Sequence, residues 1–178
     1  MLKTLGIVAA IFVVLIAGVL IYASTRPGTF SVQRSVNINA PPDKIFPLIN
    51  SLRGFNAWDP FSKKDPAIRI VHSGPETGKG AKYEWEGNRQ VGSGRVEITD
   101  TSAPSSVTMK LDMTTPMEAH NTVQFTLEPK GGMTTVTWAM KGPSPYIAKV
   151  MDVVIGMDRM VGGEFENGLA NLKALAEK

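Results

Sequence analysis

The sequence contains no cysteine, and outside its first residues it carries almost no excess charge. Its 178 residues include 19 lysines and arginines against 16 acidic residues. Without thiols, the chain cannot form disulfides, Cys-ligated zinc sites, iron–sulfur clusters or cysteine nucleophiles. Residues 1–28 hold two basic residues and no acidic one, so seventeen basic and sixteen acidic residues remain in 29–178. Because that part is nearly neutral, we expect no nucleic-acid partner, despite an isoelectric point of about 9.2.

The sequence also lacks every catalytic motif of high specificity. It has no HExxH, no P-loop, no GxSxG and no dinucleotide-binding fingerprint. Its two histidines, His72 and His120, lie far apart in the chain. His120 and Glu118 would share one face of a strand, but two ligands without a third make a weak metal site. We therefore expect no metal and no cofactor, and the balance favours a binding protein over an enzyme.

The N-terminus carries a long apolar run. Residues 5–23 contain no charged side chain, and nineteen helical residues span roughly 28 Å, close to the hydrocarbon thickness of a bilayer. Lys3 precedes the run, and Tyr22 and Arg26 lie at its far end, where interfacial side chains belong. A cleaved signal peptide would need a small-x-small site, and Ile21-Tyr22-Ala23 places a large residue there. We expect an uncleaved single-pass anchor, with a cleaved signal or a buried core helix as alternatives.

Orientation follows from a small charge difference. Lys3 and the terminal amine slightly outweigh Arg26, which favours the N-terminus inside the cell and the rest of the chain on the extracytoplasmic side. The reverse topology stays open. We divide the chain into an anchor and linker at 1–28 and one folded domain at 29–178.

The domain begins with a pattern of strands. Residues 30–38 alternate apolar and polar side chains, a short helix is expected from Pro41 to Asn50, and an aromatic-rich loop follows at 53–61. Further alternating runs are predicted at 68–72, 81–86, 95–98, 107–114, 123–127 and 134–141. Gly131-Gly132 supplies the positive φ values of a hairpin turn. Regular alternation is typical of an antiparallel sheet with one buried face.

After Gly142 the spacing becomes helical. Apolar residues recur every three or four positions from about 145 to 176, which predicts one long terminal helix. Its face at Val154, Met157, Val161 and Phe165 should pack on the sheet. The order of elements predicts an α+β domain in which a curved antiparallel sheet grips this helix, with a pocket between them.

Strand parity and the methionine content select the expected pocket wall. Methionine is flexible and polarisable, so it suits sites that accept varied apolar shapes, although each methionine alone is equally suited to a core. The candidate ligand-binding residues are those on inward strand parities, on the early loop and on the terminal helix: Trp58, Phe61, Tyr83, Trp85, Met109, Met113, Trp138, Met140, Met157 and Val161.

Several segments together resemble a known family. Residues 55–61 (FNAWDPF), 83–87 (YEWEG), 92–94 (GSG) and 165–173 (FENGLANLK) are similar to the SRPBCC (START-like) superfamily of polyketide cyclase/dehydrase and lipid-transport type. The resemblance covers about 150 residues from Thr29 onward. It implies a helix-grip fold around a deep hydrophobic cavity and apolar ligands such as lipids or polyketides. No catalytic set of the family matches this chain residue by residue.

Three functions of different classes remain. The leading expectation is a membrane-anchored binding or carrier module for a hydrophobic small molecule or lipid. The second is an enzyme of the polyketide cyclase/dehydratase type acting on a bound apolar substrate. The third is a domain with a filled core that serves protein–protein contact.

Overall fold

The computed structural model describes residues 2–178, apart from the side chains of Leu2 and Met157. The elements run in this order: α1 (Leu2–Thr25), β1 (Thr29–Ile38), α2 (Pro42–Asn50), α3 (Leu52–Trp58), the 3-10 turn η1 (Ser62–Lys64), β2 (Arg69–Ser73), β3 (Lys82–Glu86), β4 (Ser93–Ser102), β5 (Ser106–Thr115), β6 (Ala119–Lys130), β7 (Met133–Pro143), α4 (Tyr146–Ile155) and α5 (Met157–Ala176). This sequence of elements confirms the α+β prediction of a curved sheet with a long C-terminal helix.

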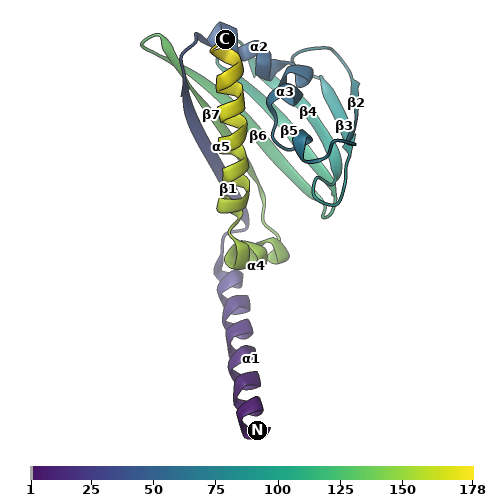
Figure 1. Cartoon of the computed structure of the whole chain (residues 1–178), viewed down its shortest axis with the longest axis vertical. Helices are drawn as coiled ribbons and strands as arrows, with labels where there is room; N and C mark the ends of the chain where they lie inside the picture. Colours follow the sequence, from purple (N-terminus) through teal and green to yellow (C-terminus); the bar gives the residue numbers. More distant parts are fainter. Residues whose placement is uncertain (1) are drawn as a thin grey trace.

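The seven strands form one antiparallel sheet in the order β1-β7-β6-β5-β4-β3-β2. The last strand, β7, pairs with the first strand, β1, and the strands from β2 to β7 pair with their sequence neighbours. Gly131 and Gly132, with φ of 59° and 87°, make the β6–β7 turn as predicted. The sheet curves around α5, α2 and α3, which lie on its concave side (Figure 1).

The structure corrects two expectations about the helices. The segment expected as a loop at 53–61 contains α3, a short helix whose first turn is capped where the Ser51 hydroxyl accepts from the Gly54 N–H. The single terminal helix is in fact two helices, because Gly156 adopts a φ of +82° and ends α4. Val154 therefore lies on α4, where its side chain is exposed, and it does not join the face that packs on the sheet.

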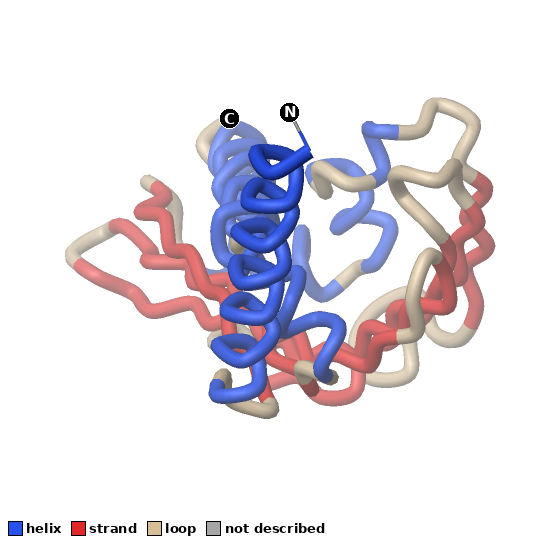
Figure 2. Tube along the Cα trace, turned by 90° about the horizontal axis from the view of Figure 1, so that it is seen from below, coloured by secondary structure: helices blue, strands red, loops and turns tan. Residues whose placement is uncertain are grey.

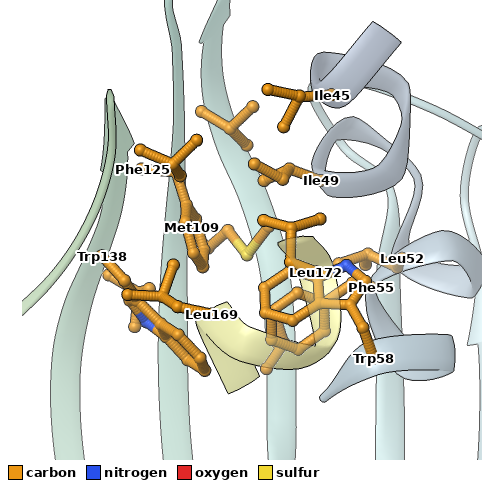
Figure 3. Packing of buried hydrophobic residues seen from close by; sticks show 14 of the residues in the cluster. Ile45, Ile49, Leu52, Phe55, Trp58, Met109, Phe125, Trp138, Leu169 and Leu172 are labelled. Carbon is orange, nitrogen blue, oxygen red and sulfur yellow. The ribbon is translucent and has the colours of Figure 1, made fainter. Parts of the chain in front are cut away.

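The buried core occupies the end of the concave face that α2 and α3 cover. Ile45 and Ile49 of α2, Leu52 of α3 and Leu172 of α5 point toward Met109 and Phe125 on the strands (Figure 3). All of these side chains are at most 2% exposed. The four helical residues therefore fill the sheet's concavity at this end.

Most of the N-terminal helix projects beyond the domain, and its last turns contact α4. α1 extends away from the sheet with its axis roughly along that of α5. α4 lies between α1 and α5 (Figure 1). Viewed from below, α1 is in front of α5, and the curved sheet wraps around the helices behind (Figure 2). Residues Lys3–Thr25 are long and apolar enough to cross a membrane, and their side chains are almost all exposed.

Candidate ligand-binding cavity

A cavity of about 230 Å³ lies between the concave sheet and the N-terminal half of α5. Its wall is mainly apolar and comes from α3, the segment after α3, strands β2 to β7 and α5. The lining residues are Phe55, Asp59, Phe61, Ser62, Ile68, Ile70, Tyr83, Trp85, Gln90, Val91, Val96, Met109, Leu111, Met113, Asn121, Val123, Trp138, Met140, Val161 and Phe165.

Aromatic rings build two parts of the wall, one at α5 and one on β3. The Trp138 ring lies parallel to Phe165, with centroids 4.1 Å apart and planes 9° apart. Tyr83 and Trp85 contact each other at 5.9 Å between ring centroids. Such aromatic contacts are rigid and apolar, so they define the wall of the cavity without offering it charge.

The structure brings together eight of the ten residues selected from the sequence. Lining the cavity are Phe61, Tyr83, Trp85, Met109, Met113, Trp138, Met140 and Val161. Trp58 is not among the lining residues, because its indole is fully buried and its Nε1 donates to the Leu48 carbonyl at 2.9 Å. It packs edge-on against Phe55 and Trp138 instead. The side chain of Met157 lies outside the described part of the chain.

Other lining residues were not selected from the sequence. Val96, Leu111 and Val123 follow the inward parity of their strands, so the pattern that selected Met109 and Met113 could also have found them. Phe55 carried no such signal, because α3 is too short to show a helical period.

Asp59 and Tyr83 are the titratable side chains on the described wall. Burial raises the pKa of the Asp59 carboxyl, although hydrogen bonds from Ser62 and Phe61 oppose that rise. The Ser62 hydroxyl donates to Asp59 at 2.6 Å, and the Ser62 and Phe61 backbone N–H groups donate at 3.0 and 3.3 Å. Burial also raises the pKa of the Tyr83 phenol well above its usual value, and the nearby Asp59 charge adds to this.

The N-terminal half of α5 is fixed to the sheet by Arg34 of β1. Its guanidinium donates to Asp158 at 2.9 and 3.0 Å and to Glu166 at 2.7 Å. The hydrogen bond from Arg34 lowers the pKa of Asp158. Gly162 leaves room for this guanidinium, since a Cβ there would collide with it. Arg34 therefore holds α5 over the cavity.

The histidines lie away from the cavity. His72 stands against the Tyr83 ring and lines a second, more polar hollow with Arg53, Glu76 and Lys82. Burial lowers the pKa of His72, and the charge of Arg53 lowers it further. His120 pairs with Asp112 at 2.7 Å and with Glu118 at 3.2 Å. Among the side chains that the structure describes, no three acidic or histidine residues are grouped to hold a metal ion.

Residues 29–177 match the family model described as polyketide cyclase / dehydrase and lipid transport. The chain belongs to this family. The match covers the whole sheet and α5, so the cavity lies entirely within the polyketide cyclase / dehydrase and lipid-transport domain. It excludes α1. No curated protein sequence matches the chain closely enough to count as a relative.

Solved structures repeat the fold at low sequence identity. Major latex-like protein 151 from Panax ginseng has a TM-score of 0.61 at 13% identity, covering 85% of this chain and all of its own. Protein CV1439 from Chromobacterium violaceum has a TM-score of 0.59 at 13% identity, covering 86% of this chain and 99% of its own. The KanY protein has a TM-score of 0.63 at 16% identity, covering 85% of this chain and all of its own. These likenesses establish the helix-grip fold alone.

Proposed function

We propose that the protein is a membrane-anchored binding or carrier module for a hydrophobic small molecule or lipid. The ligand occupies the cavity between the sheet and α5, and α1 holds the domain at the membrane. The cavity carries this proposal, because about 230 Å³ of space with a mainly apolar wall is large for a close-packed protein interior.

The chemistry of the wall supports an apolar ligand. Met109 and Met113 of β5 and Met140 of β7 offer flexible side chains from two strands of the sheet. Trp85 and Trp138 add large, fixed faces. A wall of this kind adapts to the shape of an alkyl chain or a fused ring, and its carboxyl group, Asp59, is already hydrogen-bonded within its own turn.

The hydrogen bonding of Asp59 favours binding over catalysis. Asp59 accepts three hydrogen bonds within its own turn, which account for its burial as a structural residue. A general acid or base needs a free position within hydrogen-bond distance of the substrate. The hollow interior also weighs against a domain whose only role is to present a filled core to another protein.

The anchor rests on the length and composition of α1. Its span from Lys3 to Thr25 has a mean hydropathy of 2.9. In water such a helix would expose one large apolar side chain after another, so we propose that it crosses the bilayer. With Lys3 inside the cell, the domain lies on the extracytoplasmic side.

Tryptophan emission tests the binding function. Full-length protein in detergent or nanodiscs is titrated with an apolar dye that accepts energy from tryptophan, and competing lipids then displace it. Because Trp85 and Trp138 line the cavity, binding should quench and shift their emission. Emission unchanged at saturating dye would overturn the proposal.

A matched pair of substitutions places the signal in the cavity. Met140→Trp fills the cavity and should abolish the dye response, whereas Met133→Trp, in the β6–β7 hairpin, should preserve it. Equal responses from the two variants would locate the dye elsewhere.

Topology has a direct test, since the chain lacks cysteine. A Met133→Cys variant in intact cells should react with a membrane-impermeant thiol reagent. Protection until the cells are lysed would place the domain in the cytoplasm and reverse the proposed orientation.

A further inference from the structure

Helix α4 is attached to the last turns of α1. The Tyr146 hydroxyl donates to the Leu20 carbonyl at 3.0 Å, and Arg26 pairs with Asp152 at 3.2 Å. Ala23 of α1 is 0% exposed, although the side chains before it are largely bare. Figure 1 shows α4 lying across the end of α1, beneath the rest of the domain. These contacts therefore fix the position of α4 along the axis of α1.

One face of α4 is apolar and uncovered. Ile147 and Val154, seven residues apart and so on the same face, are 55% and 67% exposed. Tyr146 and Ile155 flank them and are also exposed. The opposite side carries Asp152, which points to Arg26 beyond the apolar run of α1. The polar side of α4 is thus directed to the domain end of α1.

Exposed apolar side chains elsewhere gather at the same end of the domain. Met160 lies in the first turn of α5. Met117 lies in the β5–β6 turn, next to the C-terminal end of β7. In the described part of the domain, the other exposed large apolar side chains are Val71, on the edge strand β2, and Met133, in the β6–β7 hairpin.

The charges beside α4 suit an anionic lipid surface. The acidic residues Asp152 and Asp158 are paired with Arg26 and Arg34. Lys149 adds positive charge on the side of α4 opposite Ile147, and Arg159 adds another near the start of α5. An apolar face with cations on the polar side is the pattern of helices that lie in a membrane interface.

We propose that α4 is an interfacial helix whose Ile147 and Val154 face lies in the bilayer that α1 spans. This inference rests on the membrane anchoring proposed above. Leu20, which Tyr146 contacts, lies three residues inside the apolar run, about 4.5 Å below its end. Interfacial helices bury their apolar face roughly 5–10 Å into the boundary between headgroups and acyl chains. The contact with α1 places α4 at that depth, and the domain is held with its α5 N-terminus at the membrane.

Depth-dependent quenching tests this arrangement in the full chain. Single-cysteine variants Ile147→Cys and Val154→Cys are labelled with an environment-sensitive dye and reconstituted in phosphatidylcholine–phosphatidylglycerol vesicles, with and without brominated acyl chains. Phe12→Cys reports the anchor, and Met133→Cys is the exposed apolar control on the β6–β7 hairpin. Labels at 12, 147 and 154 should be quenched at least about twofold, whereas the label at 133 should be unaffected.

The pattern separates the two proposals. Quenching at 12 without quenching at 147 and 154 would overturn the interfacial helix and leave the anchor intact. No quenching at 12 would overturn the anchor and the inference with it. If labels at 147 and 154 become shielded in detergent as protein concentration rises, a second copy of the chain covers this face, and the inference fails.

Discussion

The two ends of the concave face differ in how they are closed. At one end, α2, α3 and the C-terminal half of α5 press Ile45, Ile49 and Leu172 against the sheet, and these side chains are 0% exposed (Figure 3). At the other end, the first half of α5, Phe55 of α3 and the segment after α3 cover the strands. There the wall formed by Met113, Met140 and other residues encloses a cavity.

The difference shows what makes this protein hollow. Three helices are enough to fill a curved sheet, as the α2 end demonstrates, and protein interiors close up wherever side chains reach. At the α4 end, one helix spans the same concavity and is held by Arg34 at its rim. Among the helices that the structure describes, α5 and part of α3 border the cavity, and fewer helical side chains therefore fill the concave face there than at the α2 end.

Truncation should separate the two ends most strongly. Leu172→Ala removes a fully buried side chain from the filled end and should lower the free energy of unfolding by about 2–5 kcal/mol. Val161→Ala borders an existing space and should cost less than about 1 kcal/mol. Denaturant unfolding measures both, and equal losses would mean that the two ends are packed alike.

Enlargement should give the same ranking of stability losses, because only the cavity end has room for added volume. Ile49→Trp overpacks the filled end and should cost about 1–3 kcal/mol of stability or more. Met140→Trp enters the cavity, so we expect a stability change below about 1 kcal/mol and a loss of ligand affinity of more than about tenfold. Unfolding and dye-titration curves on the same preparations give both quantities. A strongly destabilised Met140→Trp would indicate a solid interior.

Two glycines of α5 compare close approach with open space on one helix. A Cβ at Gly168 would come within 2.6 Å of the Trp138 ring and 3.0 Å of Pro60, so Gly168→Ala should destabilise by about 1–3 kcal/mol. At Gly163 a Cβ would meet nothing within 4 Å, and Gly163→Ala should stabilise the helix by about 0.5–1 kcal/mol. Thermal melting would contradict this account if both changes had the same sign.

The smallest effect belongs to the outer face of the sheet, where Asp112 is bonded by three cations. Its partial burial acts to raise the pKa, but hydrogen bonds from His120, Lys110 and Arg95 lower it to about 2. The hydrogen bond to Asp112 raises the pKa of His120. The Asp112 contribution to stability is thus present above pH of about 4 and lost as pH falls toward 2. The His120 contribution is present below pH of about 6.5 and lost as pH rises through its raised pKa.

NMR titration of the imidazole checks this pair. Asp112→Asn should move the pKa of His120 down toward about 6.5, because the main cause of the rise is removed. An unchanged midpoint would show that Glu118 or another neighbour sets it.

Sequence patterns predicted the wall of the cavity better than the helices that close it. Strand parity placed Tyr83 with Trp85 and Trp138 with Met140, because every second side chain of a strand faces the same side. Trp58 was selected from the aromatic loop and not by parity, and it lies outside the cavity wall. Its position depends on α3, whose seven residues show no helical period.

The break between α4 and α5 could not be read from periodicity. Apolar spacing continues from Ile147 through Leu175 as if one helix were present. Gly156 was the one local signal, and a glycine within such a pattern is compatible with either a weakened helix or a helix end. Only its φ of +82° distinguishes them. The contact of α4 with α1, on which the interfacial position depends, joins residues 126 positions apart and left no pattern in the sequence.

Ligand occupancy tests the central claim most directly. Full-length protein is extracted from membranes in mild detergent and analysed by native mass spectrometry, beside the Met140→Trp variant prepared in the same way. We predict a reproducible added mass from an apolar molecule on the wild-type chain and its loss from Met140→Trp, with both proteins folded. A bare wild-type chain that also stays bare after incubation with lipid extract would contradict the account.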